Sequence, residues 1–366
     1  MDKHQTIGII GLGLMGGSLS MALKKKYPSQ KIIGVDDKQA TEYALSIKAI
    51  DQAFPIKEVK KCIALSDTIF LCTPIDQILA LLPEISKSAK PECLITDVGS
   101  TKRSIVKQAQ KFFPPNIYFI GGHPMTGTEG SGINAANPMM FENAVYALTP
   151  SQQIPPHHIK YLGGLLEGIG AKVYFLSPAL HDKIAAAVSH LPQLVAVSLV
   201  NVIAKYQKTS SHYIKLAAGG FRDLTRIASS PYDIWDDIIK TNNDEISFFI
   251  DEFMTQLRSI QKKLIDKNLK EDFKNAAKIR YSIPKDMKGF LHPVYDLNIE
   301  VEDKPGMIAD ISTALAHQNI NIKDIEVLKV REGESGILRI SLETLVDREK
   351  AQSILRENGY SVKPRD

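Results

Sequence analysis

The sequence has little that would cross-link the chain or bind a metal ion. Its 366 residues include three cysteines, Cys62, Cys72 and Cys93, and no two of them lie in a CxxC pair. We therefore interpret the cysteines as buried, reduced thiols. The nine histidines show no HExxH spacing and no Cys/His cluster. The sequence therefore predicts no metal site.

Strong net charge and long apolar runs are also missing. The 45 basic and 41 acidic residues give a net charge of +4, which is too weak to predict a nucleic acid or a membrane as partner. No apolar stretch approaches the roughly 20 residues of a membrane helix. The opening segment MDKHQTIGIIGLG lacks a signal-peptide pattern. We expect a cytoplasmic protein.

The pattern of apolar residues divides the chain into three regions. Over residues 1–177, strand-like runs such as TIGIIGLG (6–13) alternate with helical patterns, which predicts parallel βαβ units in a Rossmann-type sheet. Over 178–285 the strand signals disappear, and the periodicity predicts an all-helical domain whose high apolar content suggests subunit packing. Over 292–366 the pattern predicts a small α+β domain of βαββαβ order. The fold class is α/β with these two added domains.

A glycine motif follows the first predicted strand. Gly11, Gly13 and Gly16 form GxGxxG, with Leu14 and Met15 at the start of the helix that follows. The first glycine permits a tight turn, the second lets the backbone approach a pyrophosphate, and the third lets helix and strand pack closely. The positive end of the helix then faces the phosphates. The motif therefore predicts a dinucleotide site.

The residues around this motif favour NAD as the cofactor. Asp36 ends the second predicted strand, where a carboxylate accepts hydrogen bonds from a ribose and repels a 2′-phosphate. Thr73 and Pro74 follow the next strand, at the edge where open parallel sheets bind ligands. The alternative is a glycine-rich turn that binds another nucleotide or no nucleotide.

His123 lies in the stretch GGHPMTGTEGSG, which has almost no apolar side chain to bury. The predicted topology places it with Ser100 at the carboxyl edge of the sheet, near the nicotinamide end of a bound cofactor. A neutral imidazole there would accept the proton of an alcohol while hydride leaves for NAD⁺. A serine beside it would orient the histidine and the hydroxyl. The alternative is that His123 only caps a turn.

The predicted helical domain carries further candidates. His190 lies in SHLPQ one turn from Gln193, and it is either a site residue or a core histidine. GGFRDLTRIASSPYDIW contains two arginines and the only tryptophan. An arginine grips a carboxylate with two hydrogen bonds. The alternative for Arg226 is an ordinary surface salt bridge.

Five stretches together resemble the prephenate/arogenate dehydrogenase family of tyrosine biosynthesis. In sequence order they are IGIIGLGLMGGSL, ITDVGSTK, GGHPMTGTEGSG, SHLPQ and GGFRDLTRIASSPYDIW. The resemblance implies a homodimer that oxidatively decarboxylates a cyclohexadienol, so that hydride passes to NAD⁺, CO₂ leaves and the ring becomes aromatic.

The resemblance also implies a role for each matching residue. His123 would polarise the ring hydroxyl with Ser100 beside it, and Arg226 would bind a substrate carboxylate. An ionic gate, partly across the dimer, would be formed by Glu129, Arg222 and Asp223. Trp235 would form an aromatic wall, and His190 would open a helix. Gln193 stands where many members have histidine near the substrate side chain. A neutral amide suits either prephenate or arogenate, and we favour prephenate.

The last region resembles the ACT regulatory domain in its stretch VEDKPGMIADISTAL. The resemblance implies that backbone groups around Asp303, Gly306 and Met307 meet an amino-acid effector, which for this pathway is L-tyrosine. The alternative is a folded tail that serves dimerisation alone.

Two other classes of protein would share part of this pattern. A β-hydroxyacid dehydrogenase would also open with a GLGxMG turn and would use a lysine such as Lys183. Membership of that class would not explain the stretch GGHPMTGTEGSG or the ACT-like region. The second class is a non-catalytic sensor of NAD or an amino acid, which would keep its role when His123 is lost. A dehydrogenase would lose turnover with that residue, so replacing His123 distinguishes the two functions.

Overall fold

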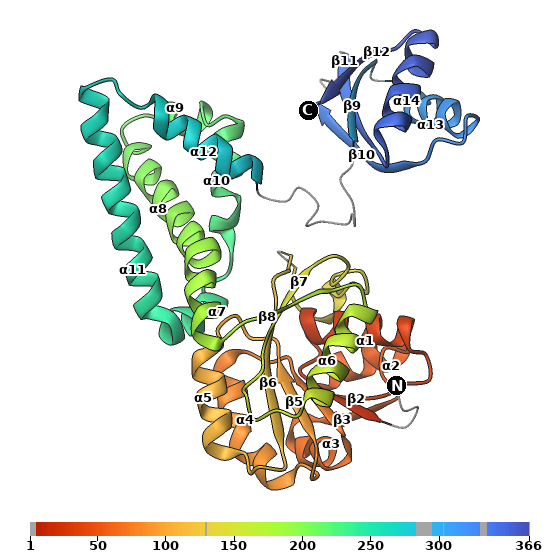
Figure 1. Cartoon of the computed structure of the whole chain (residues 1–366), viewed down its shortest axis with the longest axis vertical. Coiled ribbons are helices and arrows are strands. Elements are labelled where there is room, and N and C mark those ends of the chain that lie inside the picture. The colour runs from red at the N-terminus through yellow and green to blue at the C-terminus, as the bar shows by residue number, and fades with distance from the viewer. Residues whose placement is uncertain (1–4, 129, 283–294, 303, 330–334, 366) are drawn as a thin grey trace. The chain divides into compact units, whose positions relative to one another are not determined.

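A computed structural model describes residues 5–128, 130–282, 295–302, 304–329 and 335–365 of the chain (Figure 1). The chain forms two compact units, Met1–Lys278 and Ile279–Asp366. Each unit has its own sheet and is described by itself.

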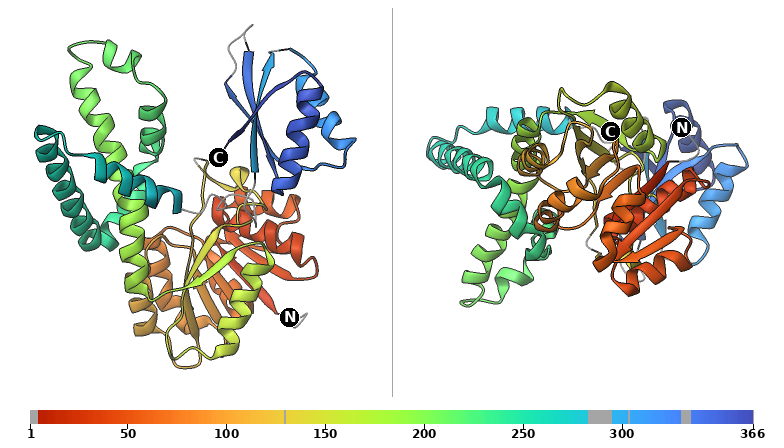
Figure 2. Two further views of the ribbon diagram at one scale, coloured as in Figure 1. Left: turned by 45° about the horizontal axis from the view of Figure 1, so that its top comes forward. Right: turned by 90° about the horizontal axis from the view of Figure 1, so that it is seen from below.

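The first unit is built on an eight-stranded sheet of order β3-β2-β1-β4-β5-β6-β7-β8 (Figure 2). Its strands are Thr6–Ile10 (β1), Lys31–Asp36 (β2), Gln52–Pro55 (β3), Thr68–Leu71 (β4), Leu94–Asp97 (β5), Tyr118–Pro124 (β6), Val145–Thr149 (β7) and Lys172–Phe175 (β8). The order reverses direction at β1 and β4. Such a switch point leaves a crevice outside the carboxyl ends of the strands. The Rossmann-type prediction is confirmed.

Two details of the sheet differ from the sequence-based prediction. β7 runs antiparallel to β6, with Gly121 opposite Thr149, so parallel pairing throughout was wrong. A parallel return needs a crossover of a dozen or more residues, usually helical; the described residues between β6 and β7 hold only the short helix η2 (Ile133–Ala135). β3 was also missed, because this short edge strand is half-exposed and has no apolar run.

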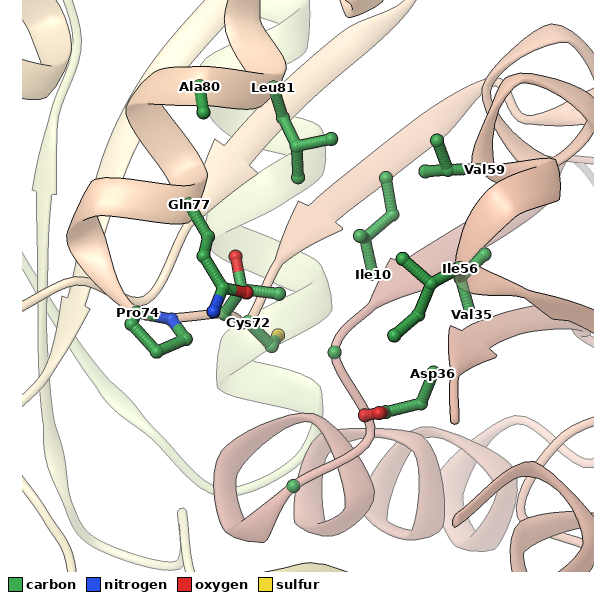
Figure 3. Close-up of a pocket in the computed structure, with 13 residues that line it drawn as sticks. Ile10, Val35, Asp36, Ile56, Val59, Cys72, Pro74, Gln77, Ala80 and Leu81 are labelled. Atoms are coloured by element: carbon green, nitrogen blue, oxygen red, sulfur yellow. The ribbon is translucent and has the colours of Figure 1, made fainter. Parts of the chain in front are cut away.

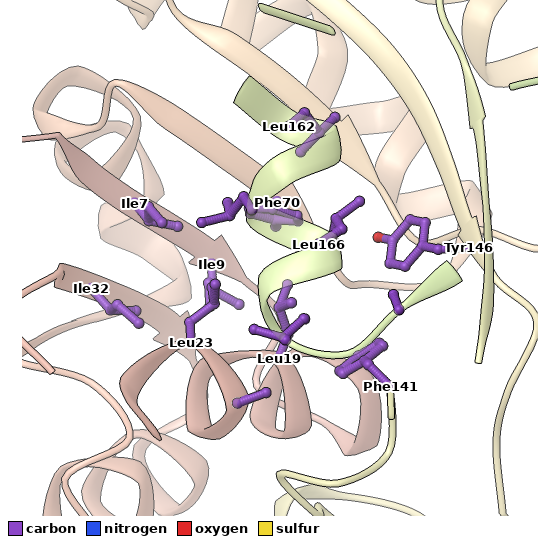
Figure 4. Close-up of a cluster of buried hydrophobic side chains, with 14 of the residues drawn as sticks. Ile7, Ile9, Leu19, Leu23, Ile32, Phe70, Phe141, Tyr146, Leu162 and Leu166 are labelled. Atoms are coloured by element: carbon purple, nitrogen blue, oxygen red, sulfur yellow. The ribbon is translucent and has the colours of Figure 1, made fainter. Parts of the chain in front are cut away.

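Helices cover both faces of the sheet. They are Leu14–Lys26 (α1), Lys38–Ser46 (α2), Ile56–Glu58 (η1), Val59–Leu65 (α3), Ile75–Ser88 (α4), Arg103–Phe112 (α5) and Pro156–Gly168 (α6). Side chains alternate along β1, so Ile7 and Ile9 pack with α1 and α6 on one face, whereas Ile10 packs with α3 and α4 on the other. Figure 4 shows the first of these clusters, in which Leu19 and Leu166 approach the strands.

The rest of the first unit is helical, as predicted. Its helices are Pro178–Ala185 (α7), Ala186–His190 (η3, a π-turn), Leu191–Tyr206 (α8), His212–Lys215 (α9), Gly219–Thr225 (α10), Arg226–Ser229 (η4), Tyr232–Ile265 (α11) and Lys270–Ser282 (α12). Pro192 lies in the first turn of α8 and cannot donate to the preceding turn. The π-turn directly before it widens the helix and places His190 inside the unit.

One helical run is longer and more apolar than the sequence analysis allowed. Pro178–Tyr206 spans 29 residues, its most apolar 18-residue window has a mean hydropathy of 1.6, and by length and composition alone it would cross a membrane. The expectation that no stretch approaches that length is therefore wrong. Only 22% of its most apolar window is buried within the chain, so this run exposes an extended apolar face.

The second unit is a four-stranded antiparallel sheet of order β10-β11-β9-β12. Its elements are Tyr295–Glu302 (β9), Met307–Ala316 (α13), Ile322–Lys329 (β10), Ser335–Leu342 (β11), Leu345–Glu357 (α14) and Ser361–Arg365 (β12). This is the predicted βαββαβ order, including the short last strand. Leu297, Ile299 and Ile340 from the sheet pack with Ile311 and Leu355 from the two helices.

Candidate active site

The glycine turn between β1 and α1 has the geometry that the motif predicts. Gly11 has φ of +94°, and a Cβ there would meet the backbone of Cys72 at 2.7 Å. A Cβ on Gly16 would lie 1.8 Å from the carbonyl oxygen of Gly11. A Cβ on Gly13 would meet no atom within 4 Å. The first and third glycines are thus required by packing, whereas the second leaves open space in front of the helix N-terminus.

A cavity of about 500 Å³ opens beside this turn (Figure 3). Gly11, Gly13, Asp36, Thr73 and Pro74, all predicted from the sequence, line it. The structure adds apolar walls and an amide that the sequence analysis missed: Ile10, Val35, Ile56, Val59, Gln77, Ala80 and Leu81. In Figure 3 Asp36 lies on one side of the cavity, and Pro74 and Gln77 lie across it. Leu14 and Met15 form the first turn of α1 and pack partly on the core.

The polar groups of the cavity suit a dinucleotide. Asp36 Oδ2 accepts a hydrogen bond from the backbone nitrogen of Leu12 at 2.5 Å, which ties the carboxylate to the glycine turn. Thr73 Oγ1 is buried without a hydrogen-bond partner among the described residues. A bound ligand would satisfy that hydroxyl, since buried polar groups are nearly always hydrogen-bonded. The apolar walls fit a flat ring, and the open turn fits a pyrophosphate. The residues present therefore fit NAD.

His123 lies near the end of β6 and is half-buried. Its Nδ1 forms a hydrogen bond of 2.8 Å with Nε2 of His181 from α7, and the two rings meet edge to face. The Nδ1 of His181 in turn lies 2.8 Å from Oδ1 of Asp182. The three side chains form a continuous chain of hydrogen bonds from a buried carboxylate to the predicted base.

This chain assigns a tautomer to His123. An ionised Asp182 accepts only, so His181 donates from Nδ1 and accepts at Nε2. His123 must then donate from Nδ1, which leaves its Nε2 with a free lone pair. Burial, with His181, Lys102 and His190 nearby, holds the pKa of His123 well below its usual value. The imidazole is therefore neutral and able to accept a proton at Nε2.

Asp182 is fully buried and is held from several sides. The backbone nitrogens of Lys102 and Arg103 donate to its two oxygens at 2.6 and 2.9 Å. Burial alone would raise the pKa of Asp182, but the hydrogen bonds from His181 and from these two nitrogens lower it overall. The nitrogens belong to the start of α5, where the helix dipole also favours an anion. The carboxylate therefore stays ionised.

A buried ion pair supports the backbone next to His123. The Lys102 ammonium contacts Asp97 and donates to the carbonyl oxygen of Gly122 at 2.7 Å. Asp97 accepts from the backbone nitrogens of Gly99 and Gly122 at 2.9 and 3.0 Å. Burial lowers the pKa of Lys102, and the attraction of Asp97 opposes that shift. The pair joins the end of β5 to the residue before His123.

His190 and Trp235 also lie in this region. Asn242 breaks the helical geometry of α11 with φ of −136°. It donates to the carbonyl oxygen of Asp182 at 2.9 Å, and its Nδ2 lies 3.3 Å from Nδ1 of His190. The edge of Trp235 meets the His190 ring, with centroids 5.9 Å apart. Burial lowers the pKa of His190 to about 4, with Asp182 opposing the shift. His190 is therefore a second neutral imidazole.

The remaining predicted substrate residues lie on neighbouring helices. Gln193 is buried and donates to the carbonyl oxygen of Ile227 at 2.9 Å, which fixes the segment that follows Arg226. Arg222 and Asp223 are exposed on α10, and Arg226 is exposed on η4. The described contacts do not join these three side chains to His123. Their predicted roles stay predictions.

Two other predicted site residues are Ser100, which the structure describes, and Glu129, which it does not. Ser100 is half-buried between β5 and α5, and within the described residues it forms no hydrogen bond with His123. We expected Ser100 to orient His123, but Nδ1 of His123 is instead held by His181. Glu129 lies outside the described residues.

The second unit has a cavity of about 310 Å³ at the start of α13. Gly306 and Met307, both predicted from the sequence, line it together with Lys304 and Pro305. Gly306 has φ of +97° and is the N-cap of α13. Asp303 lies outside the described residues.

Sequence reasoning missed the residues that hold His123 in place. His181 and Asp182 adjoin Lys183, which was considered only as the lysine of a different dehydrogenase class. Lys102 lies inside the stretch ITDVGSTK, and Asn242 lies in the middle of a long helical pattern. The usable signal was the pair His181–Asp182, a histidine next to a carboxylate at the start of a long, mainly apolar helical run.

Comparisons with known proteins cover all three regions of the chain. Residues 19–175 match the family model described as the nucleotide-binding domain of prephenate dehydrogenase, and residues 177–278 match its dimerization domain. Residues 295–359 match the ACT domain.

Individual relatives agree with these matches. The prephenate dehydrogenase of Bacillus subtilis (strain 168) is 39% identical over 362 residues, which cover 97% of this chain and 96% of the relative. A crystal structure of prephenate dehydrogenase from Aquifex aeolicus, in complex with hydroxyphenyl propionate and NAD⁺, has a TM-score of 0.71 at 29% identity and covers 77% of this chain and 99% of that one. The structure of Synechocystis arogenate dehydrogenase has a TM-score of 0.66 at 31% identity, with coverage of 75% and 99%.

The glycine turn yields a test of the cofactor site. Gly16→Ala is expected to weaken NAD⁺ binding about tenfold or more, equal to about 1.4 kcal/mol, because the added Cβ forces the turn open. Isothermal titration calorimetry with NAD⁺ measures the change. Gly164→Ala on α6 is the matched control, since a Cβ there meets no atom within 4 Å. Equal NAD⁺ affinities of the two variants would contradict the assignment.

Proposed function

This chain belongs to the prephenate dehydrogenase family, and on that premise we propose how its residues carry out the NAD-dependent oxidative decarboxylation of prephenate to 4-hydroxyphenylpyruvate. The chain is an NAD-dependent enzyme with a nucleotide-binding domain. The observation that carries the mechanism is the chain of hydrogen bonds that leaves Nε2 of His123 free to accept.

His123 acts as the base of the reaction. Its Nε2 accepts the proton of the ring hydroxyl, and the neutral state of the half-buried imidazole keeps it ready for that transfer. Bound NAD⁺, held at Gly11, Gly13 and Asp36, would supply the acceptor for the hydride on the carbon that bears the hydroxyl. The loss of CO₂ then aromatises the ring, which leaves little further covalent work for the protein. The ionised Asp182 keeps His181 in the tautomer that accepts from Nδ1 of His123.

The helical domain binds the rest of the substrate in this proposal. Arg226 binds a carboxylate, because a guanidinium forms two charge-assisted hydrogen bonds with that group. Gln193 positions the Arg226 segment through Ile227. His190 and Trp235 form a neutral wall. Ser100 contacts the ring hydroxyl, and the exposed Arg222 and Asp223 form an ionic gate with Glu129.

Replacing His123 tests the function directly. His123→Asn is expected to lower kcat about 10²–10⁴-fold, because asparagine cannot accept the proton. NADH absorbance with prephenate measures turnover, and calorimetry checks that NAD⁺ still binds. Parallel kcat/KM values for arogenate decide between the two substrates, and we expect prephenate to be preferred. Silence of the unaltered enzyme with both substrates, or near-normal turnover of the variant, would refute the proposal.

His181 is a positioning residue, and its removal should alter the pH dependence of catalysis. His181→Asn is expected to lower kcat/KM roughly 10–100-fold, because the tautomer of His123 is no longer fixed. His181 is one of the groups that depress the pKa of His123. Its loss should therefore raise that pKa and move the acid limb of the kcat/KM profile to higher pH.

The control for this experiment is His212→Asn, which changes an exposed histidine on α9. It should leave both the rate and the pH profile unaltered. An acid limb at the same pH in the His181 variant would show that His181 has a purely structural role.

We propose that the enzyme is a homodimer formed by the helical domain. Large apolar side chains are exposed along the π-turn, α8 and α11: Val188, Leu199, Val200, Val202, Tyr206, Phe248, Met254, Leu257, Ile260 and Leu264. Contiguous exposed apolar surface of this kind marks an interface. Sedimentation equilibrium of the full chain tests the proposal, and a monomer at enzyme-assay concentrations would contradict it.

L-Tyrosine is the proposed effector of the ACT domain. The cavity at Gly306 and Met307 has an open helix N-terminus that suits an amino-acid carboxylate. Deleting residues 292–366 is expected to preserve turnover, because residues up to Lys278 form their own compact unit, and to abolish tyrosine inhibition. Initial rates with increasing L-tyrosine measure this. If the shortened enzyme is still inhibited, tyrosine acts at the catalytic site instead.

Two further assignments are proposals. We propose domains at 1–177, 178–285 and 292–366; the first boundary is supported by Ser177, whose side chain caps the first helix of the helical domain. Limited proteolysis tests these boundaries. We also propose a cytoplasmic location, which the free cysteines support. Cell fractionation tests it.

A further inference from the structure

Two histidines and a glutamate meet at the amino edge of the main sheet, away from the carboxyl edge that carries His123. Glu92 precedes β5, and His157 and His158 lie in the first turn of α6. One ligand atom from each of the three residues lies within 4.8 Å of the other two. Sequence analysis predicted no metal site because Glu92 is far from the two histidines in the chain.

The contacts within this cluster leave its ligand atoms available. Nε2 of His158 lies 3.8 Å from Oε2 of Glu92, which is too long for a hydrogen bond. That nitrogen is buried and has no hydrogen-bond partner among the described residues. Tyr118 donates to the other carboxylate oxygen, Oε1, at 3.3 Å. Oε2 and Nε2 therefore face each other without a proton shared between them.

The His158 ring packs against two aromatic neighbours. Its plane is tilted by 40° to the rings of His157 and Tyr118, with centroids 4.1 and 4.3 Å away. Imidazole nitrogens beside a carboxylate are a donor set that zinc-type ions prefer.

We propose that Glu92, His157 and His158 form a site for a divalent ion of the zinc type. Bonds of about 2.0–2.1 Å place the ligands of a tetrahedral ion about 3.4 Å apart. The 3.8 Å between His158 and Glu92 needs only a small adjustment to reach that spacing. Glu92 and His157 are exposed and free to make it.

The fourth coordination position of the ion would open into a cavity of about 710 Å³ beside the cluster. Thr68, Leu94 and Tyr161 line this cavity together with the three ligands. Three protein ligands with an open fourth position leave room for water or a small anion on the ion. The bound ion would join the entry to β5 with α6, two segments that the sequence places far apart.

The test uses the full chain without a histidine tag, stripped with EDTA and exchanged into chelator-free buffer. Calorimetric titration with Zn²⁺ is expected to give one ion per chain. The Co²⁺-substituted protein should show the intense visible absorption of a tetrahedral site. Glu92→Gln and His158→Gln should each raise the Kd for Zn²⁺ about tenfold or more. Zn²⁺ should raise the thermal midpoint of the unaltered chain and not those of the variants.

Controls separate this site from other histidines. His317→Gln changes an exposed histidine at the end of α13 and should bind Zn²⁺ as the unaltered chain does. NAD⁺ binding by the Glu92 and His158 variants shows that they are folded. The proposal is overturned if the unaltered chain takes up no Zn²⁺, or if the double variant His157→Gln/His158→Gln binds it equally well. Loss of Zn²⁺ binding in His181→Asn alone would place the ion at the catalytic pair instead.

Discussion

The buried carboxylate of Asp182 is the group on which the arrangement of the catalytic site depends. It comes from α7 of the helical domain and accepts hydrogen bonds from the start of α5 in the nucleotide-binding domain. A buried charge is tolerated only where hydrogen bonds and opposite charge replace its lost hydration. The two backbone nitrogens, the helix dipole and His181 provide that replacement. The same contacts hold the helical domain against the sheet and orient the candidate base, His123.

A low local dielectric explains why this site contains neutral histidines. Burial depresses the pKa values of both His123 and His190, because an imidazolium loses its hydration there. The positive charge of Lys102 adds to this effect at His123, while Lys102 itself is compensated by Asp97. The site thus keeps its base uncharged while holding an ion pair one residue away. A neutral imidazole is the state that the proposed proton acceptor needs.

Sequence reasoning predicted the parts of the protein that local patterns encode. The GxGxxG turn, Asp36 and the loop at Thr73 line one cavity because their spacing follows from a strand, a tight turn and a helix. His123 was singled out because a histidine in a glycine-rich stretch has no packing role. The antiparallel strand β7 and the edge strand β3 were missed. Pairing direction depends on the connection between strands, and a half-exposed edge strand has a weak apolar signal.

The sequence by itself determined the order of the three regions, the cofactor turn and the candidate base, since each rests on neighbouring residues and on backbone requirements of glycine. Only the tertiary structure decided what orients that base. His181 and Asp182 reach His123 across many residues of chain, and Asn242 reaches His190 from a kink in α11. Glu92 meets His158 in the same way. Such contacts depend on how helices pack on a sheet, and no spacing along the chain encodes that packing.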